Sequence, residues 1–321
     1  MRLIKQGFEI IEQPSGLEGM YKMIEMAGRT CYKSEDKITE TSAKEFVDRM
    51  IKSGHGAMLE HGTVYLYLPW VSIGGIDAKY SRNKYSKSIF YSNAVCDKDD
   101  NSSFIPIEYG KAGHYITTNL RVLVENGWLD DLKYWCEPTE YHEKRYTVKW
   151  TIDRVTGESF LRHRVFSFAR ESTRYCNYSK DKFGNELTFI IPNWLDLTSS
   201  DNEIHIDGNE DEYCYPEDVY TLSFLYTLKY AERAYLDLLE QWEKKVPDKR
   251  FKSGFKNNPW KPQQARQVLP FSVSSPLVMT GFASDWLHFF DLRCDSHAHP
   301  QAREIATALK EEFIKRKYIK E

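Results

Sequence analysis

The sequence lacks several features that mark large classes of protein. No run of apolar residues approaches the ~20 needed to cross a bilayer as a helix. Residues 1–16 contain neither the apolar core nor the small-residue cleavage site of a signal peptide. The six cysteines are scattered and none belongs to a C-x-x-C pair, which argues against a disulfide framework and a cysteine-rich zinc site. We therefore expect a cytoplasmic protein that does not enter a membrane.

An excess of positive charge is also missing. The 44 Lys and Arg residues face 47 Asp and Glu residues, which gives a formal net charge of −3. Such a balance does not favour binding to nucleic acid or to an anionic membrane through the overall field. An anionic ligand would have to be held by a local cluster of cations.

The chain contains no internal repeat and no Gly/Ser-rich or Pro-rich linker, so we expect one domain over residues 1–321. Its 41% hydrophobic and 28% charged content is that of an ordinary soluble protein. Apolar periodicity and capping signals predict helices at 17–28, 42–53, 114–126, 219–245 and from 300 onward. In the second of these, Ser42 and Glu45 have capping-box spacing and Gly54 can close the C-terminal end. Strands are predicted at 63–68 and 146–155, and loops at 96–113 and 196–218.

An arginine cluster is the most unusual local feature. Arg162, Arg164, Arg170 and Arg174 fall within thirteen residues and are interleaved with phenylalanines. Because a guanidinium group binds phosphate bidentately and is weakly hydrated, this pattern predicts a partly buried cradle for a phosphorylated small molecule. The alternative from composition alone is a structural ion-pair network with Glu158 and Glu171, which are also part of this segment.

The spacing of the same cluster resembles a known enzyme family. Arg162-His163-Arg164, seven residues and then Ser172 is similar to the R-H-R-x7-S signature of the flavin-dependent thymidylate synthases, and Ser167, Arg174 and Tyr175 also match. Three further segments resemble blocks of that family: Gly54-His55 with Glu60-His61, Ala265 to Pro270 (ARQVLP), and Leu287 to Arg293 followed by Ser296-His297-Ala298. The resemblance is weak or silent over about 70–145 and 196–250, which we expect to be insertions.

The resemblance implies a set of site residues. The implied FAD contacts are His55, Arg162, His163, Arg164, Arg170 and His288. The implied dUMP contacts are Ser159, Arg162, Arg170, Glu171, Ser172, Thr173, Arg174 and Arg266. Arg293 occupies the position that polarises the pyrimidine ring, and no residue is implied to bind a metal. The chain departs from the family pattern at Ala57, Ser159, Ala169-Arg170 and Phe282.

The resemblance also implies an activity and an assembly. The reaction is the reductive methylation of dUMP to dTMP, with methylenetetrahydrofolate as carbon donor, FAD as hydride carrier and NADPH as reductant. A covalent enzyme nucleophile is not expected, since no proline is followed by cysteine and Cys176 is the only tempting thiol. The implied fold is a single α+β domain that assembles into a homotetramer with sites shared between subunits.

Two other classes of function compete with this interpretation. A metal-dependent hydrolase could use His55 and His61, or His297 and His299, as ligands with Glu60 as base. However, the spacing of HGAMLEH matches neither H-E-x-x-H nor H-x-x-E-H. A nucleic-acid-binding module would explain the Arg/Phe interleaving, but the net charge and the single short cluster speak against it.

Overall fold

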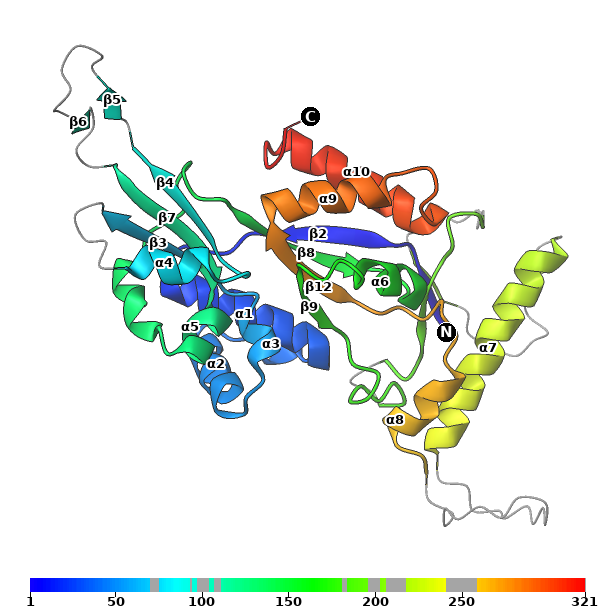
Figure 1. Ribbon diagram of the computed structural model, residues 1–321. Helices are drawn as coiled ribbons and strands as arrows, with labels where there is room; N and C mark the ends of the chain where they lie inside the picture. Colours follow the sequence, from blue (N-terminus) through cyan, green and yellow to red (C-terminus); the bar gives the residue numbers. More distant parts are fainter. Residues whose placement is uncertain are drawn as a thin grey trace.

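A computed structural model describes residues 1–69, 75–92, 94–96, 104–106, 111–180, 184–195, 203–205, 218–240 and 259–320 (Figure 1). Within these residues helices and mainly antiparallel sheets are mixed, which confirms the predicted α+β class. The strands are β1 (Arg2–Ile4), β2 (Gly7–Ile11), β3 (Thr63–Pro69), β4 (Lys87–Tyr91), β5 (Ala94–Cys96), β6 (Phe104–Pro106), β7 (Gly113–Asn119), β8 (Arg145–Thr151), β9 (Ser167–Arg170), β10 (Thr188–Ile190), β11 (Glu203–His205) and β12 (Leu277–Phe282). The helices are α1 (Gly16–Tyr32), α2 (Ser42–Lys52), α3 (Gly56–Leu59), α4 (Ile76–Ser81), α5 (Leu120–Asn126), α6 (Arg154–Phe160), α7 (Val219–Leu239), α8 (Pro262–Ala265), α9 (Ala283–Arg293) and α10 (Pro300–Lys315), with short 3₁₀ turns that include Leu129–Tyr134 and Arg266–Val268.

The central sheet has the strand order β2-β8-β12-β9, and every neighbouring pair in it is antiparallel. Alternate side chains of β12 divide its two faces, because successive residues of a strand point to opposite sides. Leu277 and Met279 join the main core with α9 and α10, which cover one face of the sheet (Figure 1). Val278 turns to the other face and packs with Ala27 of α1. The sheet is therefore enclosed between α9/α10 and α1.

Two further sheets flank the central one. The sheet β3-β7-β4 packs its buried side chains against α1, α2 and α5. The sheet β10-β1-β11 contains a parallel pair, β1 with β10, and shares a core with α7 and α8. In Figure 1 these units lie on opposite sides of the central sheet.

Most of the predicted helices are confirmed. The predictions at 17–28, 42–53, 219–245 and from 300 onward correspond to α1, α2, α7 and α10. The predicted apolar face of α10 is buried, as shown by Ala302, Ile305, Ala306, Leu309 and Phe313. Helix α7 ends at Leu239, and positions 241–245 lie outside the described residues. The predicted loops at 96–113 and 196–218 also lie largely outside them, but the described stretches β6 and β11 within these loops are strands, so the prediction is wrong there.

The helix predicted at 114–126 is wrong over its first half. Residues 113–119 form β7, which pairs with β3 on one side and β4 on the other, and only 120–126 are helical. The physical reason is the run Tyr115-Ile116-Thr117-Thr118, whose aromatic and β-branched side chains suit a pleated, buried strand. The C-terminal signal was sound, because Gly127 ends α5 with a positive φ of 70°.

The capping box predicted for α2 is also wrong. The residue at the N-cap position is Thr41, and Ser42 is already helical. The Ser42 hydroxyl accepts from the Thr39 backbone N–H at 2.9 Å and donates to the buried Glu25 carboxylate at 2.8 Å, while Glu45 pairs with Arg49. The Ser42 hydroxyl therefore binds Glu25 of another helix, whereas the local sequence spacing predicted that it would cap its own helix.

Candidate active site

The Arg162-His163-Arg164 segment is a tight turn between α6 and β9. Asp153 caps α6 by accepting from the Thr156 N–H at 2.7 Å. After the helix ends, backbone hydrogen bonds from His163 to Phe160 and from Arg164 to Arg162, both 3.0 Å, fold the chain back. This turn buries His163 and leaves both arginine side chains exposed.

His163 makes its side-chain contact with Arg293 at the end of α9. The Arg293 Nε donates to His163 Nε2 at 2.8 Å, and Arg293 Nη2 donates to the Ser159 carbonyl at 2.8 Å. Burial and then the positive charge of Arg293 lower the pKa of His163 to about 4, so this imidazole is neutral near pH 7. Burial, followed by the positive charge of Arg162, lowers the pKa of Arg293. The His288 ring lies 6.1 Å from the His163 ring, centroid to centroid.

Arg170 is held by partners within the chain. Its Nη1 forms an ion pair with Glu158 at 2.8 Å, and its Nε donates to the Ser275 hydroxyl at 2.7 Å. The structural ion-pair alternative is therefore correct for this arginine. A contact from Arg170 to FAD or dUMP, as the resemblance implies, would require breaking the pair with Glu158.

The loop after β9 carries the implied nucleotide contacts. Glu171 is buried and accepts a short hydrogen bond from the Tyr178 hydroxyl, and burial raises the pKa of its carboxyl. The Ser172 N–H donates to the Cys31 carbonyl at the end of α1 at 2.9 Å. Thr173 is buried, whereas Arg174 is exposed. The end of α1 and the edge of the central sheet thus fix the loop before Arg174 emerges from it.

Arg174 connects this loop to two other segments. Its Nε donates to Gln263 of α8 at 3.1 Å, and Arg266 begins the 3₁₀ turn that follows the same short helix. On the other side, the Arg174 guanidinium lies 5.2 Å from the Tyr175 ring centroid. That ring lies 5.6 Å from Tyr32, whose hydroxyl is 3.5 Å from His55 Nδ1.

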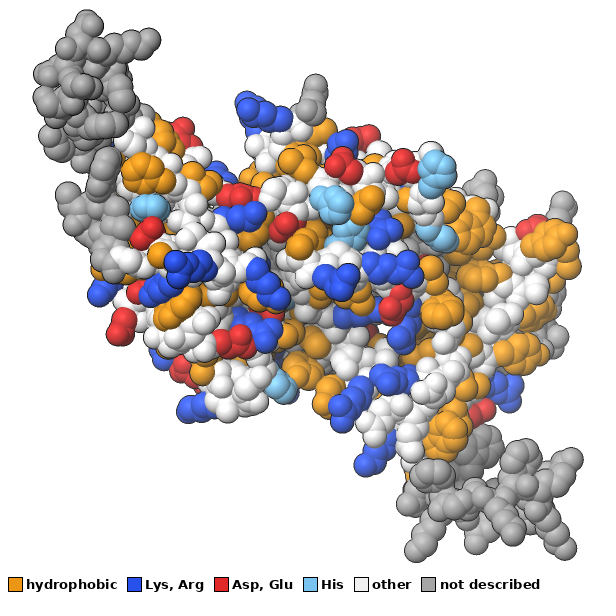
Figure 2. Space-filling view, viewed as in Figure 1, with side chains coloured by type: hydrophobic (Ala, Val, Ile, Leu, Met, Phe, Trp, Pro, Cys, Tyr) orange, Lys and Arg blue, Asp and Glu red, His pale blue; other side chains and the backbone are white. Residues whose placement is uncertain are grey.

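The implied residues therefore gather in two groups at opposite ends of β9. We call Ser159, Arg162, His163, Arg164, His288 and Arg293 the α9 group. We call His55, Ser172, Thr173, Arg174 and Arg266 the loop group. Figure 2 shows Lys and Arg side chains gathered on one face of the molecule, over α6 and β9 and toward α8.

Arginines in both groups have no acidic partner. Within the described part of the chain, no Asp or Glu carboxylate forms an ion pair with Arg162, Arg164, Arg174 or Arg266. Arg293 likewise contacts only a neutral ring and a carbonyl oxygen. Cations without an acidic partner among the described residues can attract an anionic ligand.

The sequence interpretation missed Arg145, which belongs to a buried polar cluster. Arg145, at the start of β8, donates to the Glu60 carbonyl at 3.0 Å and to the Ser167 hydroxyl at 3.2 Å, and burial lowers its pKa to about 10. His61 is fully buried with its Nδ1 2.8 Å from the Thr280 hydroxyl. Burial lowers the pKa of His61 to about 3. The sequence feature that could have indicated this cluster is Arg145, a charged residue directly before the predicted strand.

The metal-hydrolase alternative depends on two histidine pairs, and the fold separates the first of them. His61 is enclosed in the core, whereas His55 is exposed on the surface. His297 is exposed and pairs with Asp295 at 2.8 Å. Over the described ranges, no three His, Cys, Asp or Glu side chains gather where a metal ion could bind. No helix in the same ranges has the length and apolar composition to cross a membrane.

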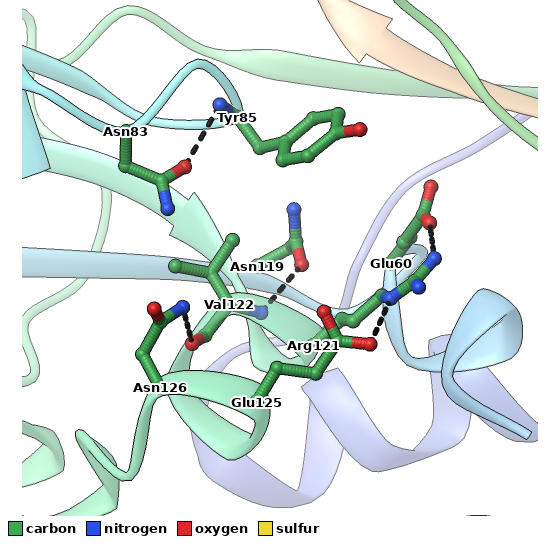
Figure 3. Close-up of a pocket in the computed structure, with 8 residues that line it drawn as sticks. All are labelled: Glu60, Asn83, Tyr85, Asn119, Arg121, Val122, Glu125 and Asn126. Atoms are coloured by element: carbon green, nitrogen blue, oxygen red, sulfur yellow. Dashed lines mark hydrogen bonds and ion pairs between the residues drawn. The ribbon is translucent and has the colours of Figure 1, made fainter. Parts of the chain in front are cut away.

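A small pocket lies beside α3 and α5, apart from the arginines of both groups (Figure 3). Arg121 crosses it and pairs with Glu60 at 2.5 Å and Glu125 at 2.7 Å. A side chain on Gly56 would meet Arg121 Nε at 3.1 Å, so this ion-pair cluster packs closely against the start of α3, next to His55. The ion pairs of Arg121 therefore pack against Gly56, the first residue of α3.

Comparison with known proteins identifies the family. The family model described as thymidylate synthase complementing protein matches residues 15–109 and 137–316, which is most of the chain. The chain belongs to this family. The resemblance drawn from the arginine signature is thereby confirmed.

Two named sequence relatives agree with the assignment, and one solved structure aligns at low similarity. The flavin-dependent thymidylate synthase of Corynebacterium glutamicum is 20% identical over 298 residues, which are 92% of this chain and 76% of the relative. The enzyme of the same name from Pyrococcus abyssi is 26% identical over 202 residues, which are 60% of this chain and 75% of the relative. A crystal structure of the UMP/dUMP methylase PolB from Streptomyces cacaoi, bound with 5-Br dUMP, aligns with a TM-score of 0.40 at 16% identity. That alignment covers 98% of this chain and 93% of that chain.

Proposed function

We propose that this protein is a flavin-dependent thymidylate synthase that converts dUMP to dTMP. The proposed reaction takes its carbon from methylenetetrahydrofolate and its reducing equivalents from NADPH, with FAD as the cofactor. The observation that carries the proposal is the set of four arginines, in two groups, that lack carboxylate partners within the described residues. The family membership supplies the reaction, and the arginines supply a site for its phosphorylated ligands.

The α9 group suits a dinucleotide cofactor. Arg162 and Arg164 leave the same tight turn as exposed side chains, and no acid neutralises them within the described residues, which fits a diphosphate. The neighbouring His288 side chain is exposed and can contact a planar ring. When bound, FAD would supply the redox chemistry that amino-acid side chains do not possess.

The loop group suits the phosphate of dUMP. Arg174 and Arg266 come from separate segments that Gln263 brings together, so two guanidinium groups can hold one phosphate. The Ser172 hydroxyl oxygen accepts weakly from the Arg174 N–H at 3.4 Å, which leaves the hydroxyl hydrogen to donate to a ligand.

Arg293 suits the task of polarising the pyrimidine. Its Nε and Nη2 are fixed by His163 and the Ser159 carbonyl, whereas its Nη1 has no partner within the described residues. A positive donor held beside a uracil carbonyl stabilises negative charge that develops there as the ring becomes nucleophilic. This role requires no covalent attack by the protein.

The thiol chemistry of other nucleotide methylases is not supported here. Cys176 is fully buried, and burial, followed by the negative charge of Glu171, raises its pKa to about 12. A thiol that stays protonated at neutral pH is a poor nucleophile. The proposed mechanism therefore leaves activation of the pyrimidine to Arg293.

We also propose that the complete site is shared between subunits of a homotetramer. The four residues of β9 separate the two groups by about 13 Å at the rise of an extended strand. In a closed assembly the α9 group of one subunit can face the loop group of another, so that nucleotide and cofactor meet.

An absorption spectrum of the purified protein tests the proposal directly. We expect flavin bands nearly stoichiometric with the chain, and their bleaching by NADPH under anaerobic conditions. Addition of dUMP and methylenetetrahydrofolate should then yield dTMP, measured by chromatography, and omission of either should abolish the product. Protein that stays colourless after incubation with FAD would contradict the proposal.

A further inference from the structure

The hydrogen bond between His163 and Arg293 defines the state of the imidazole. A guanidinium group has only donors, so the Nε2 atom that lies 2.8 Å from Arg293 Nε must be an acceptor. The ring is then neutral and carries its proton on Nδ1. Its Nε2 is occupied and is not available to a cofactor.

The surroundings of His163 favour this neutral form. The charged and titratable groups that act on it, Arg293 and His288, both come from α9, and a positive charge on either opposes protonation of the ring. Phe289 and Phe166 enclose it, with ring centroids 5.0 and 6.3 Å from that of His163. His163 is therefore a neutral hydrogen-bond acceptor that two phenylalanine rings hold in place.

The same hydrogen bond constrains Arg293. The Nε and Nη2 atoms form one edge of the guanidinium, and this edge is filled by His163 and the Ser159 carbonyl. The opposite end, with Nη1, remains for a ligand. A long side chain that two hydrogen bonds hold in one rotamer loses little freedom when it meets its substrate.

We infer that His163 is a positioning residue: its Nε2 atom aims Arg293 at the pyrimidine, and its effect on the reaction passes through Arg293. The inference rests on the proposed function for the role of Arg293. His163, the central residue of the Arg162-His163-Arg164 turn, would thus orient Arg293 rather than contact a ligand itself.

Two substitutions separate this role from a merely structural one. In His163→Gln the amide oxygen can reach the place of Nε2, whereas in His163→Asn the shorter amide reaches only the place of Nδ1. We expect His163→Asn to lower kcat for dUMP by about 10- to 100-fold, the range of a lost hydrogen bond to a charged group, with a smaller change in KM. His163→Gln should recover at least part of that loss. FAD content and thermal unfolding report whether each variant folds and binds cofactor.

A double-mutant cycle then tests the path of the effect. If His163 acts through Arg293, His163→Asn causes no further loss in the residual single-turnover rate of dTMP formation of Arg293→Ala, measured at high enzyme concentration. Equal activities of the Gln and Asn variants, additive losses in the cycle, or a loss of FAD content parallel to the loss of turnover would each overturn the inference.

A measurement that does not need turnover keeps the inference separate from the proposed function. Nitrogen-15 NMR of the histidine rings, assigned with His163→Gln, should show His163 protonated on Nδ1, with a pKa below 6.5 that rises in Arg293→Ala. A ring protonated on Nε2, or a pKa insensitive to Arg293, would overturn the inference. Failure of the wild-type protein to form dTMP would instead count against the proposed function alone.

Discussion

Gly281 of β12 lies against Phe166, two residues after the Arg162-His163-Arg164 turn, and replacing it should disturb both stability and the site. A Cβ atom at this position would lie 2.4 Å from two ring carbons of Phe166. Ordinary carbon–carbon contacts are about 3.5–4.0 Å, so the overlap exceeds an ångström. Phe166 is buried against Trp286 and Phe289 and cannot simply rotate away. Overpacking of this kind costs about 1–3 kcal/mol.

Thermal unfolding of Gly281→Ala measures this cost. For a chain of this size we expect Tm to fall by about 1.5–4.5 °C. Gly7→Ala is the matched control, because Gly7 also lies in the central sheet and a Cβ added there would have no neighbouring atom within 4 Å. The control should leave Tm within about 1 °C of the wild type, since most uncrowded substitutions change the free energy of unfolding by less than about 0.5 kcal/mol.

A compensating substitution tests whether the Phe166 ring is the cause. Phe166→Leu removes ring atoms that the new methyl group would strike, so Gly281→Ala should be less harmful in that background than in the wild type. The same crowding should lower FAD affinity in the single variant, because Phe166 directly follows the turn that carries Arg162 and Arg164. Equal Tm values for Gly281→Ala and the wild type, or purely additive effects in the double variant, would refute the packing argument.

Three further predictions follow from the charges of the site and of the core. Arg293→Ala should retain FAD and lose dTMP formation, and full turnover would rule out its polarising role. Arg266→Ala should weaken dUMP binding by up to about 3 kcal/mol in calorimetry, whereas Arg316→Ala, which breaks an ion pair on α10, should not change it. His61 has a folded pKa of about 3 against 6.5 when unfolded, so its contribution to stability is complete above pH 6.5 and is lost as pH falls toward 3. Urea unfolding should lose about 2 kcal/mol from this group between pH 7 and pH 5, and His61→Gln should flatten that dependence.

The sequence was informative where a pattern is local. Helices α1 and α10 could be predicted because apolar residues recur at helical spacing over several turns. The arginine signature could be recognised because its residues lie in fixed register within one turn, one strand and one loop. Strand β7 was mistaken for helix because Gly127 and the apolar residues of α5 extended the helical pattern backward.

The contacts that set the chemistry could not be predicted, because they join distant segments. Nothing near His163 in the sequence indicates that its partner is Arg293, 130 positions away. The partner of Arg170 could not be predicted either. Glu158 and a bound phosphate are both negatively charged, so the sequence alone does not show which of them the arginine contacts. The burial of Arg145 could not be predicted, because a single arginine at the start of a strand usually reaches solvent rather than the core.

The placement of the two arginine groups at either end of one short strand has a consequence for how the protein can change. Strand β9 is paired along its length only with β12 among the described strands, and its two ends enter different turns. On the proposed function, a substitution in the turn before the strand acts first on the α9 group, and one in the loop after it acts first on the loop group. Cofactor binding and phosphate binding would then depend on different segments of the chain. A change in the length of β9 itself would alter both together.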